Sequence, residues 1–399
     1  MTFKDKLADY RSRYNGLKTK ESKGRFLTRI AEAFGFERKY LIKLLNGQRD
    51  FKPPKGRGRT YGKDVERLAL RLRSAAADPC APYFAVMLPR IVADWEALRG
   101  PIDGDLRSRL LRVSVSTLAR WFGKHPSKRP RHGNRRSGSN RLRDGVPRCP
   151  GRDLEDGAPG VLQVDTVAHG GGGPEPFFYS VDMADAETQW IEFDFIWCRG
   201  GKAVKEAIGP MLRRFPFKVR RAHPDGGGEF MNQPVLELFK ALFPKVEVFR
   251  SRPGHPNDNC RVEQKNGSVI RAWLGEARLD DRTLEPKLHE LARLLRINHN
   301  LFVPCKKLIG KSPGDKPHTS CRYRYDKPQT PLERCKASGR CDPAKIAQLE
   351  KLRDSVNSLQ LVAKIKALVK EILSSSSHSQ SGCGASPAAT PLPHRRPLF

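Results

Sequence analysis

The spacing of apolar residues changes along the chain, from helical periodicity before residue 124 to strand-like patterns after residue 158. In residues 1–50, Leu27, Ile30 and Phe34 fall at helical spacing until Gly35 breaks the pattern. A second apolar group follows and ends at Asn46 and Gly47. This pattern predicts two short helices joined at a glycine, which is the arrangement of a helix-turn-helix.

Residues 62–123 continue the helical periodicity. Ser114 or Ser116 can cap a helix that carries Leu118 and Trp121, because a serine hydroxyl accepts a hydrogen bond from the first helical turn. A helix that starts in this way after a short turn is typical of a recognition helix, so we expect a second helix-turn-helix over 62–123. Residues 124–157 are dense in Lys, Arg, Pro, Gly and Ser and predict a basic flexible linker.

Short strands joined by tight turns, followed by strands that alternate with helices, are expected over residues 158–300. This order predicts an α/β domain with a mixed five-stranded sheet, as in the ribonuclease-H-like fold. The expected strands are 161–167, 177–183, 189–196, 217–222 and 246–250, and the expected helices are 201–214, 234–242 and one that begins near residue 260.

The C-terminal part, residues 301–373, combines an extended basic stretch over 316–334 with helical periodicity over 343–373. We expect this region to bind DNA or another subunit. Residues 374–399 are rich in Ser, Pro and Ala and predict a disordered tail. The fold class is therefore multidomain: all-α helix-turn-helix modules, a central α/β core, and a helical and extended basic C-terminal region.

Charge points to the partner, because 75 Lys and Arg against 43 Asp and Glu give a net charge of +32. Such a field attracts phosphate backbones, although a basic ribosome-associated protein would also carry it. An ordinary helical hairpin with a solvated charged side is the alternative for the first helix-turn-helix. The expected DNA contacts in the two modules are Arg38, Lys39 and Lys43, and Ser116, Thr117 and Arg120.

Cysteine usage and hydropathy predict the compartment. Nine cysteines without the spacing of a zinc site indicate reduced thiols. The N-terminus is polar, and no apolar run approaches the length of a membrane helix. We therefore expect the protein to work where it is made, without a membrane.

Three acidic residues, Asp165, Asp225 and Glu263, stand where metal-binding carboxylates would be placed. Asp165 lies in the first strand, Asp225 at the glycine turn after the fourth, and Glu263 at the start of the helix after the fifth. Mg²⁺ or Mn²⁺ prefers such oxygens, and two ions can both activate an attacking hydroxyl and stabilise a leaving oxygen at phosphorus. Nearby candidates for phosphate contacts are Arg250, Arg252, Arg261, Lys265 and Arg271. The rival acids are Asp182, Asp185, Asp194, Glu229 and Asp258.

The residues around the three acids carry a family resemblance. Gln163-Val-Asp-Thr-Val-Ala-His169, Asp225-Gly-Gly-Gly-Glu-Phe-Met-Asn232 and the stretch from Ser251 to Asn266 resemble bacterial insertion-sequence transposases with a retroviral-integrase-type catalytic core. By this resemblance, Asp165, Asp225 and Glu263 match the Asp-Asp-Glu (DDE) metal triad. The chain departs from the family at Gly226, where Asn is usual, and at Pro256, where a basic residue is usual.

The resemblance implies a DNA transposase that uses two Mg²⁺ or Mn²⁺ ions for strand cleavage and strand transfer. It would nick double-stranded DNA at element ends and then direct the 3′-hydroxyl to target DNA. Synapsis of two ends implies a homo-oligomer, and the expected place of action is the bacterial cytoplasm, at the nucleoid. Two alternatives remain open: a catalytically decayed transposase that acts as a DNA-binding regulator, and a ribonuclease-H-like nuclease that cleaves without joining.

Overall fold

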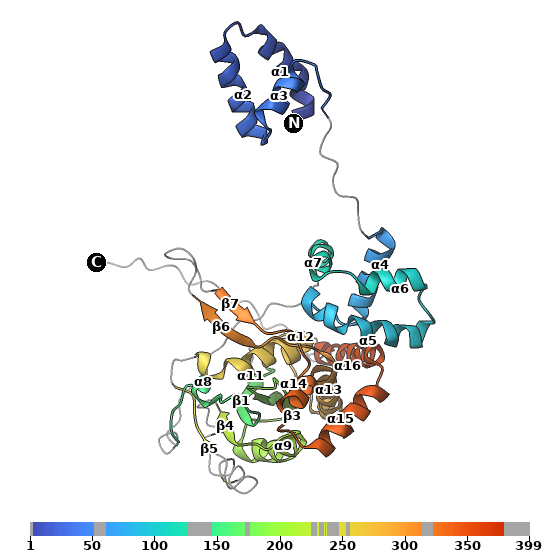
Figure 1. The fold of residues 1–399 in the computed structure, drawn as a ribbon. Helices are drawn as coiled ribbons and strands as arrows, with labels where there is room; N and C mark the ends of the chain where they lie inside the picture. Colours follow the sequence, from blue (N-terminus) through green and yellow to red (C-terminus); the bar gives the residue numbers. More distant parts are fainter. Residues whose placement is uncertain are drawn as a thin grey trace, which may run out of the picture. The chain divides into compact units, whose positions relative to one another are not determined.

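The computed structural model describes residues 3–51, 61–126, 146–171, 176–224, 230, 235, 237, 247–252, 256–312 and 322–378. The chain divides into two compact units, Met1–Gly62 and Lys63–Phe399. Figure 1 shows the helices and strands of both units, coloured along the sequence.

The first unit is helical, and the predicted break at Gly35 is confirmed. Gly35 has a φ of 68° and ends the second helix, while the Thr19 hydroxyl accepts a hydrogen bond from Ser22 N (3.1 Å) at its start. Phe3 packs on Phe34, with ring centroids 5.1 Å apart, and anchors an earlier helix that the apolar spacing did not single out. The helices are α1 (Phe3–Gly16), α2 (Lys20–Phe34) and α3 (Arg38–Leu45).

The second unit begins with further helices, as predicted. Of the two serines proposed as a cap, Ser114 is the one that accepts a hydrogen bond, from Thr117 N at 3.3 Å. Leu118 and Trp121 point into the core from the helix that Ser114 caps. These helices are α4 (Lys63–Ala75), α5 (Ala81–Arg99), α6 (Gly104–Leu111) and α7 (Val115–Lys124).

A mixed five-stranded sheet forms the centre of the second unit, as the sequence predicted, in the order β3-β2-β1-β4-β5. β1 pairs antiparallel with β2 and parallel with β4, and β4 pairs parallel with β5. β4 begins later than predicted because Phe217 leaves this sheet and bridges to Cys341 instead. The strands are β1 (Val161–Ala168), β2 (Tyr179–Asp185), β3 (Ile191–Ile196), β4 (Arg221–Pro224) and β5 (Glu247–Val248).

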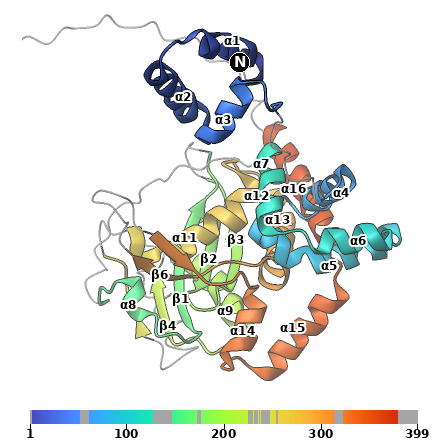
Figure 2. The same ribbon diagram turned by 45° about the horizontal axis from the view of Figure 1, so that its top comes forward.

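Helices cover both faces of the sheet. α11 packs against β1 and β2, as Figure 2 shows. Arg214 of α9 donates to Glu192 of β3 (2.6 Å), and by strand alternation the Glu192 side chain lies on the face opposite Asp182. Of the predicted helix 234–242, the structure describes only Val235 and Glu237, both helical. The elements are α8 (Gly151–Leu154), α9 (Gly201–Arg214), η2 (Pro256–Asn259), α11 (Cys260–Lys265), the π-helix η3 (Asn266–Arg271), α12 (Ala272–Leu274), η4 (Arg282–Leu284), α13 (Glu285–Ile297) and the π-helix η5 (Asn298–Phe302).

The C-terminal part contains a two-stranded ribbon and three helical segments. The single helix predicted over 343–373 is wrong in one respect, because Val356 is extended (φ −103°, ψ 124°) and splits it in two. The second half packs against α13 and α5 and reaches His378; residues 379–399 lie outside the described residues. The elements are β6 (Leu308–Ser312), β7 (Arg322–Tyr325), α14 (Pro331–Ser338), α15 (Pro343–Ser355) and α16 (Ser358–His378). No helix in the described part of the chain is long and apolar enough to cross a bilayer.

Candidate metal and nucleic-acid site

Gln163 fixes the start of α11 to the central strand. Its Oε1 accepts hydrogen bonds from the backbone N–H groups of Arg261 (2.8 Å) and Val262 (3.3 Å). Its Nε2 donates to the carbonyl of Asp258 at 3.2 Å. Because alternate residues of a strand share a face, Asp165 projects from β1 on the same side as Gln163. The face of β1 that carries Asp165 is therefore the face against which α11 is held.

Asn266 connects the same helical segment to Asp165. Asn266 Nδ2 donates to Asp165 Oδ2 at 2.8 Å, and Asp165 Oδ1 accepts from Thr166 N at 2.8 Å. Glu263 stands three residues before Asn266, and residues at this spacing are neighbours on one helix face. The structure thus brings Glu263, which is exposed, to within about one helical turn of the residue that touches Asp165.

Asp225 lies outside the described residues, but the strand that precedes it is described. Pro224 pairs with Val164, the residue before Asp165, in the parallel register of β4 and β1. His223 fixes this end of β4, through contacts of Nδ1 with Asn259 Oδ1 (2.7 Å) and of Nε2 with the Cys149 carbonyl (2.9 Å). The ends of β1 and β4 and the start of α11 are therefore connected by buried polar side chains.

A rival acid, Asp182, lies on the adjacent strand β2 and is the register partner of Asp165. It is fully buried, and its Oδ1 has no hydrogen-bond partner among the described residues. Burial raises its pKa well above the usual range, and the nearby negative charge of Asp165 raises it further. Ser180 Oγ approaches the other oxygen at 3.5 Å. These surroundings favour the protonated form of Asp182.

The arginines and the lysine expected to contact phosphate all have partners within the protein. Arg252 forms two hydrogen bonds with Asp258 (3.0 and 2.9 Å), Arg261 forms two with Glu155, and Arg271 pairs with Glu276. Arg250 is buried and donates to the carbonyl of Val146 at 2.9 Å. Lys265 is 2% exposed, and burial lowers its pKa. In this conformation these contacts hold the segments that surround α11.

Most residues predicted to contact DNA in the two helix-turn-helix modules are exposed, and one is buried. Arg38, Lys39 and Lys43 are exposed on α3, and Arg38 Nη1 donates to the Thr28 hydroxyl at 3.1 Å. On α7, Ser116 and Arg120 are exposed. Thr117 is buried, and its hydroxyl accepts from Arg120 at 3.1 Å, so it supports the helix rather than the exposed surface.

Gln163 and Asn266 lie within the sequence motifs of the acids, but the sequence alone predicted no role for them. Gln163 precedes Asp165 by two positions on one strand face, and Asn266 follows Glu263 by three on one helix face. These two spacings are the signal that could have identified them. The partner of each, about 100 residues away in the chain, carries no such local signal.

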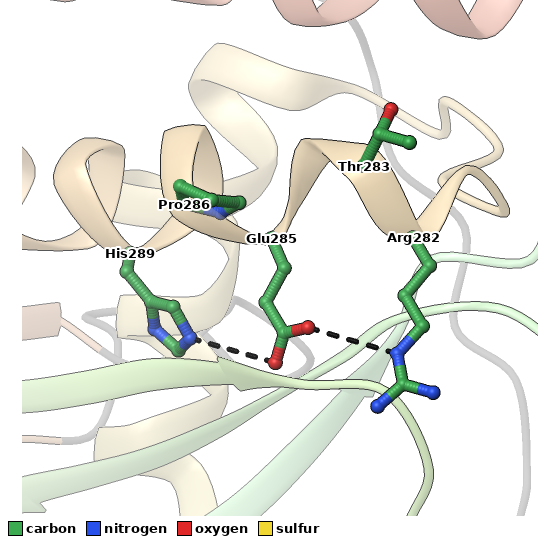
Figure 3. Close-up of a pocket in the computed structure, with 5 residues that line it drawn as sticks. All are labelled: Arg282, Thr283, Glu285, Pro286 and His289. Atoms are coloured by element: carbon green, nitrogen blue, oxygen red, sulfur yellow. Dashed lines mark ion pairs between the residues drawn. The ribbon is translucent and has the colours of Figure 1, made fainter.

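A separate hollow lies at the start of α13 and contains none of the predicted site residues (Figure 3). Glu285 occupies its centre and pairs with Arg282 (3.7 Å) and His289 (3.9 Å). Its polar side chains thus interact with one another.

The donor set of the acid site suits a hard cation. Asp165 and Glu263 offer carboxylate oxygens, the ligands that Mg²⁺ and Mn²⁺ prefer. Within the described ranges, no group of three His, Cys, Asp or Glu side chains is placed to hold a metal ion. Asp225, the third predicted ligand, is not among those residues.

Comparisons with known proteins find a relative and solved structures that are similar to the chain. No family model matches it. The crystal structure of the catalytic core domain of BIV integrase aligns with 35% of this chain and 82% of its own, at 15% identity. The TM-score of this alignment is 0.27.

A sequence relative gives the stronger match. The uncharacterized protein y4rM of Sinorhizobium fredii is 30% identical over 327 residues, which are 80% of this chain and 91% of the relative. This identity extends over nearly the whole relative, so the chain belongs to the same protein family as y4rM.

Proposed function

We propose that the protein is a DNA transposase that uses a DDE triad for metal-dependent strand cleavage and strand transfer. The observation that supports the proposal is a pair of side-chain contacts: Gln163 binds the start of α11, and Asn266 of η3, three residues beyond Glu263, donates to Asp165. Carboxylates from a central strand and from a crossing helix are a suitable frame for divalent cations beside a phosphodiester.

In this proposal, Asp165, Asp225 and Glu263 hold two Mg²⁺ or Mn²⁺ ions. When bound, these ions would activate the attacking oxygen and stabilise the leaving one. Asn266 orients the Asp165 carboxylate, and Gln163 sets the distance between β1 and α11. Asp182, with its raised pKa, limits the negative charge around Asp165 before metal binds.

Double-stranded DNA is the proposed partner, both as element ends and as target. The net charge of +32 supports it, as do the exposed basic residues of α3 and α7. Synapsis of two ends requires more than one protomer, so we propose a homo-oligomer that acts at the bacterial nucleoid.

The test uses Asp165→Asn, Asp225→Asn and Glu263→Gln in the full chain, with Asp194→Asn on the edge strand β3 of the same sheet as the matched control. The substrate is a duplex that carries the genomic ends flanking the coding sequence. In Mg²⁺, we expect each triad variant to lose nicking and strand transfer but to keep the Kd for DNA, and the control to keep all three. Full activity in any triad variant would refute the assignment.

The same assay separates the two alternatives. A decayed transposase that acts as a regulator would bind the ends without nicking them, in the wild type as in the variants. A nuclease would nick in Mg²⁺ and produce no joined product.

A further inference from the structure

The β6–β7 ribbon presents an unusual surface. Tyr323 and Tyr325 are 53% and 50% exposed, Ile309 is 49% exposed, and Arg322 and Arg324 between and beside the tyrosines are also exposed. The ribbon is separate from the five-stranded sheet, and Figures 1 and 2 both draw β6 beside α11. Large exposed aromatic rings next to arginines indicate an interaction surface for another molecule.

Strand alternation sorts these side chains onto two faces. Arg322 and Arg324 share one face of β7, and Tyr323 and Tyr325 share the other. Arg324 pairs with Gly310 on β6, and its guanidinium lies 3.7 Å from the position that a Cβ on Gly310 would occupy. The arginine thus extends across the ribbon where the partner strand has no side chain. Neither strand contains an acidic residue.

This combination fits nucleic acid better than a second copy of the chain. Guanidinium groups match phosphate oxygens, and a tyrosine ring can pack on a sugar or a base. A two-stranded ribbon is also narrow enough for the major groove of B-DNA. Two copies of the ribbon would instead place arginines against arginines, which is unfavourable.

The base of the ribbon is fixed to the helix that carries Glu263. Asp326, just after β7, accepts from Lys307 N (2.7 Å) and from Arg334 Nη1 (2.6 Å). Arg334 Nη2 donates to the carbonyl of Cys305 at 2.7 Å. Cys305 also interacts electrostatically with the buried Lys265 of α11, two residues beyond Glu263. A duplex on the ribbon would therefore be held at a fixed place relative to α11.

We propose that the β6–β7 ribbon is a DNA-binding element that seats duplex DNA beside the acid site. Arg322 and Arg324 contact the phosphate backbone, and Tyr323 and Tyr325 contact the groove. The choice of duplex DNA rests on the proposed function, whereas binding by the ribbon requires neither metal nor the acids.

The experiment measures the Kd of the full chain for a fluorescent duplex without divalent metal, over a series of salt concentrations. The first variant is Arg322→Ala with Arg324→Ala. Its matched control is Arg282→Ala with Arg293→Ala, which removes the same charge from the α13 side. We expect the ribbon variant to weaken binding by at least about tenfold and to reduce the slope of log Kd against log salt by about 2, because each lost phosphate contact removes about one unit. The control should retain the wild-type slope.

The aromatic face is tested separately, with Tyr323→Ala plus Tyr325→Ala against the two Tyr→Phe substitutions. We expect the alanine pair to weaken binding without changing the salt slope, and the phenylalanine pair to bind as wild type does. Circular dichroism checks that each variant is folded. Kd values and slopes equal to the control in both ribbon variants would overturn the proposal.

Failure of the ribbon and failure of the proposed function give different results. If the protein is no transposase but the ribbon binds DNA, Asp165→Asn will match a wild type that has no nicking activity, while the ribbon variants will still lose affinity. If only the ribbon assignment is wrong, nicking will be lost in Asp165→Asn and retained in the ribbon variants.

Discussion

Asn266 combines a well-placed hydrogen bond with an unsatisfied one. Its Nδ2 donates to Asp165, whereas its buried Oδ1 has no partner among the described residues. A buried unpaired oxygen costs about 1–3 kcal/mol, so a residue that served stability alone would be a poor choice here. The contact with Asp165 is therefore the feature of Asn266 that the acid site uses.

We expect Asn266→Ala to raise the Mg²⁺ concentration needed for nicking by about tenfold, the effect typical of losing a residue that orients a metal ligand. A titration of nicking against Mg²⁺ measures this shift. Gln264→Ala, an exposed position on the same helix, is the control and should leave the titration unchanged. Equal titrations for Asn266→Ala and wild type would show that Asn266 does not orient Asp165.

His169 gives a second prediction at the scale of one residue, for stability against pH. Burial lowers its pKa from 6.5 to about 3, so between these values the unfolded chain binds a proton that the folded chain does not. Its stabilising contribution is fully present above about pH 6.5 and is lost progressively as the pH falls toward 3. In urea unfolding near pH 5, we expect His169→Gln to reduce the slope of the unfolding free energy by about 1 kcal/mol per pH unit. An unchanged slope would contradict a neutral, buried His169.

At the scale of one element, α7 depends on its cap. Ser114 Oγ accepts from Thr117 N, whereas Ser116 is an exposed residue of the first turn. An N-cap serine contributes about 1 kcal/mol, so Ser114→Ala should lower the free energy of unfolding by that amount and Ser116→Ala by much less. Urea unfolding of the two variants measures the difference. The reverse order would mean that the helix begins at Ser116.

Elements with a strong local pattern could be predicted, and those set by distant contacts could not. The strands β1 and β2 follow from short apolar runs, and the end of α2 at Gly35 follows from a glycine in the left-handed region. The start of β4 could not be predicted, because Phe217 pairs with Cys341, over 100 residues later in the chain, and not with the central sheet. The prediction of an extended stretch over 316–334 is wrong for 331–334, which are helical in α14, and nothing local shows that 322–325 pairs with 308–312.

The same distinction holds for the candidate site in the molecule as a whole. The motifs around Asp165 and Glu263 predict the two acids as site residues, because the context of each acid lies in its neighbouring residues. The contacts between the strand of Asp165 and the helical segment after Glu263 join positions about 100 residues apart, such as Gln163 with Arg261 and Asp165 with Asn266. Such contacts form only in the folded structure and produce no periodic pattern in the sequence.

The division into two compact units predicts two independent unfolding transitions. Phe3 lies at the centre of the aromatic cluster of Met1–Gly62, and Ile365 of α16 is fully buried in the core of the second unit. All five tryptophans follow residue 62, so tryptophan fluorescence reports on the second unit alone.

A buried Phe→Ala change costs about 3–5 kcal/mol, most of the stability of so small a unit. Phe3→Ala should therefore remove part of the helical circular dichroism and leave the urea midpoint of tryptophan fluorescence unchanged, while Ile365→Ala lowers that midpoint. A midpoint that moves with Phe3→Ala would show that the two units unfold together.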